Sequence, residues 1–353
     1  MKIGVYVHWA GVGGAEDMAI DEIRYADRNR FNYTFFTEED SGWGPCLQEL
    51  KDMDVPVVRL SHRPEAFLEE YKAMGIQLVH VFSCGDVQPG YEAALQLGLP
   101  VVDTAACAGY SAGYERAPQT VQPVYLCQKH WEHGGGGKSE FKVIVGGVDL
   151  ERLRTDKNHS QCKQHWGLDP AHLVFGFFGR FDQFKCPYSF VEMANELHKQ
   201  MPDSQFIMFG DGPDKGRSEF LAKQYKLDVR FPGFTREKAM AFGAMDVFVF
   251  PTWQEAFGRV MVEAMALGVP IVTADYPVCH EVCGQVAVYV TNERADPMSK
   301  QNIAEYADRA RGLIVDREMY NAMAGLGFER ARANFSAARM AREYGALYEE
   351  MRK

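Results

Sequence analysis

Two glutamates, Glu255 and Glu263, stand eight residues apart at a point where the chain could hold a polar ligand. The apolar run 247–250 before them predicts a buried parallel strand, and a helix that contains Glu263 is predicted to follow. Both carboxylates would then lie near the start of this helix, at the carboxyl end of the strand, where open α/β sheets bind ligands. Carboxylates accept hydrogen bonds from hydroxyls, and the free N–H groups of the first helical turn favour a phosphate.

Such a pair could hold hydroxyls and a phosphate at once, as a sugar nucleotide requires. Gly258, between the two glutamates, would let the backbone come close to that ligand. In the alternative interpretation, Glu255 is only a charge at a helix N-terminus and Glu263 belongs to a solvated helix face. The two residues by themselves do not decide between these interpretations.

Length and composition limit the classes of protein to consider. A chain of 353 residues suggests about two domains at ~150 residues each, and 46% hydrophobic residues suffice for sizeable cores. The net charge of −10 argues against a nucleic-acid-binding protein, which usually carries a basic surface. Residues 1–150 hold 12 Lys and Arg against 21 Asp and Glu, a net charge of −9, which also suits an anionic membrane surface poorly.

The cysteines and the apolar runs bear on the compartment. Eight cysteines are scattered without paired spacing, which favours a reducing cytoplasm over a disulfide framework. Cys279, His280 and Cys283 lack a second pair of ligands, so we predict no metal site. No apolar run reaches ~18 residues and the chain opens directly into a strand, so we expect neither a signal peptide nor an integral membrane segment.

Strand and helix patterns alternate along the first half of the chain, beginning with a strand, a glycine turn and a helix. This order predicts a parallel sheet with helices on both faces. The predicted strands are 2–8, 33–37, 55–60, 78–82, 100–104, 121–127 and 141–145, and the predicted helices are 15–27, 64–74 and 91–97.

The second half repeats the scheme after a polar stretch, 150–172, that we interpret as a linker. Two similar α/β halves imply a cleft between them, which is a common place for a ligand. The predicted strands are 174–178, 205–210, 229–231, 247–250, 270–273 and 287–290, with helices at 188–200, 215–225, 238–242 and 263–267. The last ~55 residues are helical by periodicity, with a break at 335–336.

Several motifs, taken in order, resemble one known family, the retaining GT-B nucleotide-sugar glycosyltransferases (glycosyltransferase family 4, glycosyl transferases group 1). The resemblance is stronger over residues 174–350 than over 1–150, where a glycine loop and an interdomain V-I-P-N-G-V-D motif, here with Val and Gly in place of Pro and Asn, carry it. The matching segments are Gly13-Gly14-Ala15-Glu16, residues 143–149, Gly179 to Lys185 (G-R-x-x-x-x-K), Gly210 to Pro213 (G-x-G-P), Phe231 to Phe234, Glu255 to Glu263, and the closing helix 335–351.

The resemblance implies a GT-B fold of two Rossmann-like, doubly wound α/β domains that face each other across a cleft. It places an acceptor-side domain at 1–155, with the helix 336–353 packed back on it, and a donor-binding domain at 156–335. It also implies transfer of a hexose from a UDP- or GDP-sugar to an acceptor hydroxyl, with retention and without a metal ion. The nucleotide-sugar is the donor substrate, and no cofactor is expected.

The resemblance assigns three catalytic residues, Arg180, Lys185 and Glu255. The two cations would hold the diphosphate, where fixed positive charge stabilises the leaving group. Glu255 would contact sugar hydroxyls near the reacting face, and Glu263 would accept hydrogen bonds from the ribose hydroxyls. The remaining implied donor-binding residues are Gly13 and Gly14, which leave room for the diphosphate, Gly210, Gly233 and Phe234 near the base, and Ala256, Phe257 and Gly258 in the sugar pocket.

The sequence departs from the family pattern after the strand 100–104. Many family members carry a His there, whereas this chain has Asp103-Thr104-Ala105-Ala106-Cys107. Two other histidines, His8 and His80, lie at or within strands, and we interpret His80 as a hydrogen-bonded strand residue. Two alternatives therefore stay open: a sugar-nucleotide-binding GT-B protein with weak or no transferase activity, and a GT-B epimerase or phosphorylase.

Overall fold

The chain folds into two compact α/β units, each built around its own parallel sheet. The computed structural model describes residues 1–11, 13–39, 44–83, 88–107, 120–133, 140–291 and 300–352. Unit 1 comprises Met1–Asp149 and Phe335–Lys353, and unit 2 comprises Leu150–Asn334. The division thus falls at 149/150, a few residues before the 155/156 boundary placed from the sequence. The two segments of unit 1 are joined where they meet by an isolated parallel bridge between Val148 and Ser336.

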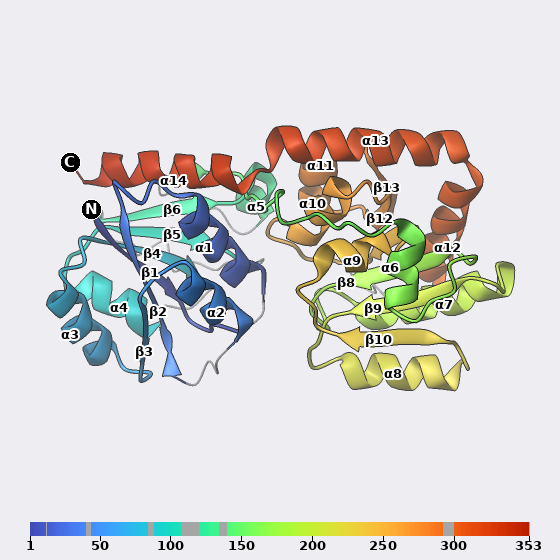
Figure 1. Ribbon diagram of the computed structural model, residues 1–353, viewed down its shortest axis with the longest axis horizontal. Coiled ribbons are helices and arrows are strands. Elements are labelled where there is room, and N and C mark those ends of the chain that lie inside the picture. Colours follow the sequence, from blue (N-terminus) through green and yellow to red (C-terminus); the bar gives the residue numbers. More distant parts are fainter. Residues whose placement is uncertain are drawn as a thin grey trace. The chain divides into compact units, whose positions relative to one another are not determined.

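Unit 1 contains a seven-stranded sheet in the order β3-β2-β1-β4-β5-β6-β7 (Figure 1). Its strands are β1 (Lys2–Val7), β2 (Asn32–Glu38), β3 (Val57–Leu60), β4 (Leu78–Ser83), β5 (Val101–Ala105), β6 (Val121–Tyr125) and β7 (Lys142–Val143). Its helices are α1 (Gly14–Tyr25), α2 (Pro45–Asp52), α3 (Pro64–Met74), α4 (Pro89–Gln96), α5 (Gln128–His133) and the C-terminal α14 (Ala337–Met351).

Unit 2 contains a six-stranded sheet in the order β10-β9-β8-β11-β12-β13, also parallel throughout. Its strands are β8 (Val174–Phe178), β9 (Gln205–Phe209), β10 (Val229–Gly233), β11 (Val247–Phe250), β12 (Ile271–Ala274) and β13 (Ala287–Val290). Its helices are α6 (His159–His165), α7 (Pro187–Gln200), α8 (Lys215–Gln224), α9 (Lys238–Gly243), α10 (Arg259–Ala266), α11 (Pro277–Cys283), α12 (Lys300–Val315) and α13 (Arg317–Asn334).

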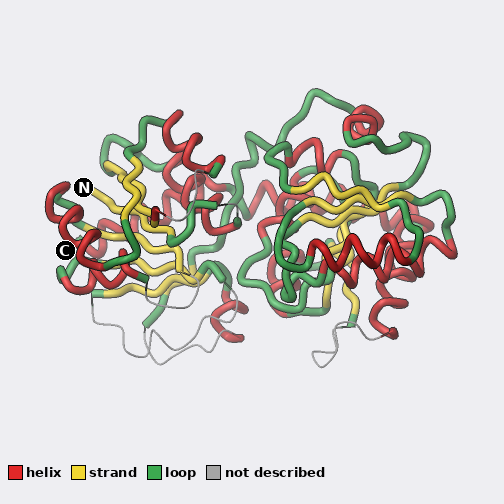
Figure 2. Tube along the Cα trace, turned by 90° about the horizontal axis from the view of Figure 1, so that it is seen from below, coloured by secondary structure: helices red, strands yellow, loops and turns green. Residues whose placement is uncertain are grey.

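In both units the helices cover the two faces of the sheet (Figure 2), so the strands are buried on both sides. This explains why they consist of near-continuous apolar runs such as Val174–Phe178 and Val247–Phe250. The doubly wound fold class predicted from the alternating pattern is confirmed. In each sheet the strand order reverses beside the first strand of the unit, which places the loops of a binding site at the carboxyl ends of its central strands.

The shorter helices are where the sequence predictions were incomplete. The stretch interpreted as a linker contains α6, which Asn158 caps by accepting a hydrogen bond from the Gln161 N–H while the Gln161 side chain bonds back. Helices α2, α5 and α11, of six to eight residues, were not predicted either. Helices of this length give a weak periodic signal, which sufficed for α4 and α9 but not for these three. The C-terminal helical region breaks at 335–336 as predicted, and a second time between α12 and α13.

The described residues include no helix with the length and apolar character needed to cross a bilayer. Six cysteines are free and buried: Cys46, Cys127, Cys162, Cys186, Cys279 and Cys283. Cys107 is disulfide-bonded, so the expectation of a chain without disulfides is wrong at that position. The proximity of two sulfur atoms depends on the tertiary fold, which the spacing of cysteines in the sequence does not reveal.

Candidate functional site

Three loops at the carboxyl ends of neighbouring strands in unit 2 are held together by backbone hydrogen bonds. The Gly179 N–H, after β8, donates to the carbonyl of Phe209 at the end of β9. The Gly210 N–H, after β9, donates over 3.0 Å to the carbonyl of Gly233 at the end of β10. The predicted residues Arg180, Gly210 and Gly233 therefore stand on adjoining loops at one edge of the sheet.

Gly210 has a backbone that only glycine accommodates. Its φ is +133°, and a Cβ there would lie 1.8 Å from the carbonyl oxygen of Gly179. Gly233 also has a positive φ, +85°, but none of the described atoms comes within 4 Å of the position of its Cβ. The first glycine thus permits close packing of two loops, whereas the second leaves open space beside the half-buried Phe234.

Lys185 and Glu255, far apart in the sequence, form an ion pair with 2.6 Å between Lys185 Nζ and Glu255 Oε2. The ammonium also donates to the carbonyl of Gln254 over 3.1 Å, and Glu255 Oε1 accepts from the N–H of Ala256. Both side chains are mostly buried, with exposed fractions of 20% and 12%. Two of the three predicted catalytic residues are therefore in direct contact, at the loop that follows β11.

The loop that carries Lys185 is rigidly built. Asp182 Oδ1 accepts from the backbone N–H groups of Phe184 and Lys185. Trp253 Nε1 donates to the carbonyl of Gln183 over 2.6 Å, which ties this loop to the one before Glu255. These contacts fix the backbone from which the Lys185 side chain extends.

Arg180 is more exposed than Lys185, with 56% of its side chain accessible. Its Nε lies 3.5 Å from Asp182 Oδ2, so the same aspartate holds the Lys185 loop and contacts the guanidinium. The described contacts do not join Arg180 to Glu255 directly. Its predicted contact with a diphosphate stays a prediction.

Glu263 lies in the second turn of α10 and is 1% exposed, so the interpretation of this residue as part of a solvated face is wrong. Its Oε1 lies 2.6 Å from Lys238 Nζ and 3.9 Å from a nitrogen of the Arg259 guanidinium. Its other oxygen, Oε2, is buried and accepts no hydrogen bond from the described part of the chain. A buried carboxylate oxygen without a donor is costly, so this atom is suited to a ligand that brings hydroxyl donors.

The resemblance assigns the sugar pocket to the segment between the two glutamates, and this role stays a prediction. Ala256 and Phe257 are buried, and Gly258 is the N-cap of α10 with φ +82°. A Cβ on Gly258 would lie 2.2 Å from the methyl carbon of Met261 and 3.2 Å from Cγ of Glu255. Glycine at this position therefore permits the turn that presents Glu255 at the N-terminus of the helix.

Two cations beside Glu263 escaped the sequence analysis. Arg259 is nearly buried and stands four residues before Glu263, a spacing that brings side chains together on a helix and could have indicated the contact. Lys238 is the first residue of α9 and lies 25 residues before Glu263, so no local sequence pattern indicated their contact.

Gly13 and Gly14, the predicted diphosphate-facing residues of the first domain, lie in unit 1. Gly13 is the N-cap of α1 and Gly14 is its first residue, six and seven positions after Val7, where β1 ends. The carbonyl of Gly13 accepts from the N–H of Asp17 over 3.2 Å. Their place at a helix N-terminus fits an anion, and their part in donor binding stays a prediction.

Two other polar groups flagged in the sequence are structural. His80 is fully buried in β4, where Nε2 lies 2.8 Å from Thr104 Oγ1 and Nδ1 lies 2.6 Å from the Tyr348 hydroxyl. The interpretation of His80 as a hydrogen-bonded strand histidine is confirmed. Cys283 is wholly buried in α11, and burial raises the pKa of its thiol to about 12, which does not favour a thiolate ligand.

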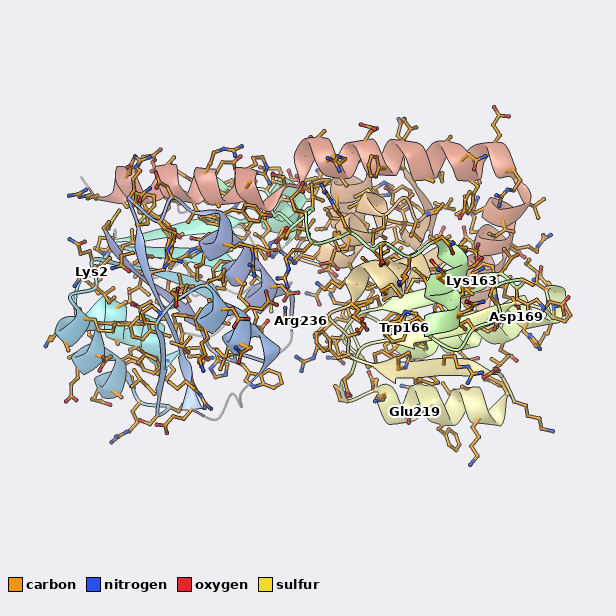
Figure 3. All side chains as sticks on the ribbon, viewed as in Figure 1. Lys2, Lys163, Trp166, Asp169, Glu219 and Arg236 are labelled. Atoms are coloured by element: carbon orange, nitrogen blue, oxygen red, sulfur yellow. The ribbon has the colours of Figure 1, made fainter. Side chains whose placement is uncertain are left out.

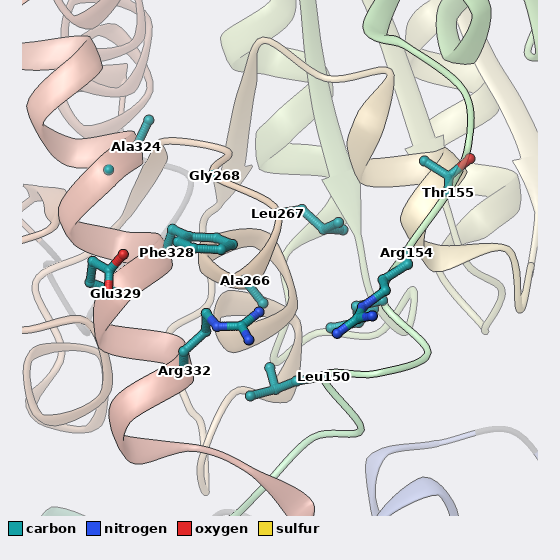
Figure 4. A pocket seen from close by; sticks show the side chains of 12 residues that line it. Leu150, Arg154, Thr155, Ala266, Leu267, Gly268, Ala324, Phe328, Glu329 and Arg332 are labelled. Carbon is teal, nitrogen blue, oxygen red and sulfur yellow. The ribbon is translucent and has the colours of Figure 1, made fainter.

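A cavity of ≈ 700 Å³ opens elsewhere in unit 2 (Figure 4). It lies between the residues that follow Leu150, the turn around Gly268 after α10, and the face of α13 that carries Phe328 and Arg332. None of its lining residues is a predicted donor-binding residue. The assignment of the donor site therefore rests on the contacts of Lys185, Glu255 and Glu263 and not on this cavity.

Known proteins resemble this chain both in sequence and in fold. Residues 172–314, less than half of the chain, match the family model described as glycosyl transferases group 1. The match includes Arg180, Lys185, Glu255 and Glu263. This segment of unit 2 thus resembles group 1 glycosyltransferases in sequence.

Curated relatives carry similar names. The lipopolysaccharide core biosynthesis mannosyltransferase LpsB of Rhizobium meliloti (strain 1021) is 30% identical over 216 residues, which cover 59% of this chain and 60% of LpsB. The putative glycosyltransferase YtcC of Bacillus subtilis (strain 168) is 24% identical over 375 residues, which cover 96% of this chain and 88% of YtcC. The chain thus spans about three fifths of LpsB and most of YtcC.

Solved structures share the fold along the whole chain. The crystal structure of Anabaena HepE in complex with UDP and glucose superposes with a TM-score of 0.82, covering 99% of each chain at 20% identity. That of WaaG, a glycosyltransferase involved in lipopolysaccharide biosynthesis, gives a TM-score of 0.76 at 14% identity, covering 98% of this chain and 99% of WaaG. The motif resemblance, the family match and the fold together support a glycosyltransferase of the GT-B fold.

Proposed function

We propose that this protein is a retaining glycosyltransferase that moves a hexose from a UDP- or GDP-sugar to an acceptor hydroxyl, without a metal ion. The acceptor class comprises glycans, glycolipids and small molecules. Two features of unit 2 carry the proposal. One is the ion pair between Lys185 and Glu255, and the other is Glu263 Oε2 on the following helix, which is buried and accepts no hydrogen bond from the described residues. Lys185 and Glu255 are suited to a diphosphate and a sugar, and Glu263 is suited to the ribose hydroxyls.

The chemistry follows from these contacts. Cleavage of the sugar–phosphate bond leaves negative charge on the diphosphate, which Lys185 and Arg180 would stabilise in place of a metal ion. As Lys185 turns toward the diphosphate, Glu255 is released from its ion pair and can accept hydrogen bonds from sugar hydroxyls. In a front-face retaining reaction the leaving phosphate takes the proton of the acceptor hydroxyl. The protein then needs no additional base, which accommodates the absence of a His after β5.

The nature of the donor is the first thing to test. A thermal-shift screen with UDP, GDP, ADP and their hexose conjugates should show one nucleotide that stabilises the protein by about 2.7 kcal/mol at ~100 times its dissociation constant. The complexes of HepE with UDP and UDP-glucose favour beginning with the uridine series. No shift with any nucleotide would contradict the assignment of the donor site.

Turnover, stereochemistry and metal requirement need separate measurements. Mass spectrometry of reactions with the stabilising donor identifies the product, and the coupling of the anomeric proton in NMR shows whether configuration is retained. Equal rates with and without EDTA are expected if no metal takes part. Inversion, or loss of activity in EDTA, would contradict those parts of the proposal.

A second candidate function is a sugar-nucleotide-binding protein with weak or no transferase activity. The sequence at the end of β5 favours it, because residues 103–107 contain no His, and Asp103 accepts a hydrogen bond from the Ser83 hydroxyl over 2.5 Å. This candidate predicts nucleotide binding without product for any acceptor. A GT-B phosphorylase would instead require inorganic phosphate, and an epimerase would convert the sugar nucleotide without any acceptor.

A cytoplasmic location is also part of the proposal. Six free, buried cysteines support it, whereas the disulfide at Cys107 counts against a reducing compartment. Fractionation of cells that express the native protein tests it. Recovery with the periplasmic or extracellular fraction would contradict it.

A further inference from the structure

Three side chains with metal-binding atoms meet at the carboxyl ends of three neighbouring strands in unit 1. His8 follows β1, Glu38 ends β2, and His62 follows β3. The distance between His8 Nδ1 and Glu38 Oε1 is 2.7 Å, and His62 Nδ1 contacts the other oxygen, Glu38 Oε2. The centroids of the two imidazole rings are 6.0 Å apart. Parallel pairing of β1, β2 and β3 thus gathers residues that are 24 to 54 positions apart.

The spacing of these atoms suits a small divalent ion. One ligand atom from each residue lies within 4.8 Å of the other two, and among the described residues this is the one such group of three or more His, Cys, Asp or Glu side chains. Zinc binds imidazole nitrogen at ~2.0–2.1 Å and carboxylate oxygen at ~2.0–2.2 Å, so tetrahedral ligand atoms stand roughly 3.3–3.5 Å apart. Small rotations of the imidazoles, which are 50% and 61% exposed, would therefore admit the ion.

The carboxylate is the fixed member of the group. The side chain of Glu38 is 7% exposed, and Oε1 accepts a hydrogen bond from the Tyr6 hydroxyl over 2.8 Å. Tyr6 is itself buried and packs edge-on against Phe67 with 5.4 Å between ring centroids. A ligand oriented by an outer hydrogen-bond donor is a common feature of metal sites. The two histidines, in contrast, can adjust because they are exposed.

We propose that His8, Glu38 and His62 form a binding site for a divalent transition-metal ion of the zinc class, with an open coordination position. Two imidazoles and one carboxylate match the ligand sets of open zinc sites, whereas Mg²⁺ prefers an all-oxygen set. A bound ion would link the ends of three strands, and water or an oxygen ligand would complete its coordination. The site lies wholly within unit 1 and does not depend on the assignment of the donor site in unit 2.

The competing interpretation is a carboxylate that only accepts hydrogen bonds from two histidines. A matched control exists on unit 2, where His280 Nε2 lies 2.6 Å from Asp275 Oδ1 and both side chains are exposed. This pair has the same imidazole–carboxylate contact without forming a three-ligand group among the described residues. His280→Ala therefore removes an exposed histidine of the same kind while leaving the proposed site intact.

The test is a titration of the full-length, tag-free and chelator-treated protein with Zn²⁺ by isothermal calorimetry, followed by Co²⁺ as a spectroscopic probe. We expect one equivalent to bind, with Co²⁺ giving visible d–d bands but no thiolate charge-transfer band. His62→Ala and Glu38→Gln should each weaken binding at least about tenfold, since even outer-sphere partners of metal ligands are worth 10–100-fold. His280→Ala should bind as the wild type does, and Mg²⁺ in excess should not displace the ion.

His62→Ala keeps the test decisive if Glu38→Gln fails to fold, because His62 is exposed and its removal leaves the core intact. Absence of Zn²⁺ binding would overturn the proposal and leave two imidazole–carboxylate hydrogen bonds only. Binding that His62→Ala and Glu38→Gln do not weaken, or a thiolate band with Co²⁺, would place the ion elsewhere and overturn it equally.

Discussion

Each unit has a buried polar cluster around a glutamate, Glu22 in unit 1 and Glu263 in unit 2, and the two clusters differ in what surrounds the second carboxylate oxygen. In unit 1, both ring nitrogens of His80 have hydrogen-bond partners and Glu22 Oε1 accepts from the Tyr348 hydroxyl. Glu22 Oε2 accepts no hydrogen bond from the described residues, but it lies 2.9 Å from His80 Nδ1. In unit 2, one oxygen of Glu263 is paired with Lys238, while the other is buried without a donor among the described residues. We infer that the His80–Glu22 group stabilises the fold and that Glu263 Oε2 accepts hydrogen bonds from a ligand.

The location of each group agrees with this difference. The His80 cluster joins β4 to the C-terminal helix α14, which crosses back to unit 1 after residue 334 (Figure 1). It therefore fixes the last segment of the chain on the sheet. The Glu263 group lies on α10, next to the loop that carries the Lys185–Glu255 pair, at the edge of the sheet where ligands bind.

The largest expected effect comes from Lys185→Ala. Removing this cation should lower the transfer rate about 10²–10³-fold, because fixed charge at the leaving group is lost, while the fold survives. Steady-state kinetics with the identified donor, alongside the melting temperature, measures both quantities. Lys199→Ala, at the exposed end of α7, is the control. A wild-type rate in Lys185→Ala would contradict the catalytic role that we assign to Lys185 in unit 2.

Next in size is His80→Ala, which should destabilise unit 1 by about 2–4 kcal/mol. The substitution opens a cavity and leaves the buried hydroxyls of Thr104 and Tyr348 short of a partner. Thermal unfolding should begin at a lower temperature, whereas the affinity for the nucleotide should not change. A variant with normal melting but impaired nucleotide binding would reverse the roles that we assign to the two groups.

A smaller effect is expected for Glu263→Gln. Loss of the charged acceptor should weaken nucleotide binding by about 1.5–3 kcal/mol, the usual worth of hydrogen bonds to a charged group. Calorimetric titration of the nucleotide against wild type and variant gives the difference. The melting temperature without ligand should fall less than in His80→Ala, because only one of the two carboxylate oxygens has a partner. Unchanged affinity would show that this buried oxygen does not meet the ligand.

The smallest effect concerns Asp246, a charged residue of unit 2 that is fully partnered. Burial by itself would raise the pKa of Asp246, but hydrogen bonds from His159, Lys163 and the Val174 N–H outweigh it and leave the pKa below the ordinary value. Lys163 projects from α6 (Figure 3) and is nearly buried, 2.8 Å from Asp246 Oδ2.

Because the folded-state pKa of Asp246 is lowered, its contribution is fully present above the unfolded value of ~3.9 and is lost as the pH falls from there through the folded value. Asp246→Asn should therefore reduce stability by about 1–2 kcal/mol at pH 7 and make melting less sensitive to acid. Melting temperatures of both proteins between neutral and acidic pH measure this. Parallel curves for the two proteins would contradict the assignment.

Much of the fold could be predicted, because parallel strands buried on both faces must be apolar along their whole length. This gave the strands around Val174–Phe178 and Val247–Phe250, and the glycine motifs gave the loops after them. About two turns give only a weak periodic signal, so the short helix α9 was predicted whereas α11 was not. The contact of Arg259 with Glu263 is predictable from the sequence, because residues four positions apart lie on the same face of a helix.

The sequence by itself determined the alternation of strands and helices, the glycines that the loops require, and which carboxylates and cations are present. Only the tertiary structure decided which of these charges meet. Lys185 and Glu255 are 70 residues apart, and His80 and Tyr348 are 268 apart, yet each pair is in contact. In a parallel sheet every strand end is brought to the same edge by a crossover, so contacts there depend on strand order and not on distance along the chain.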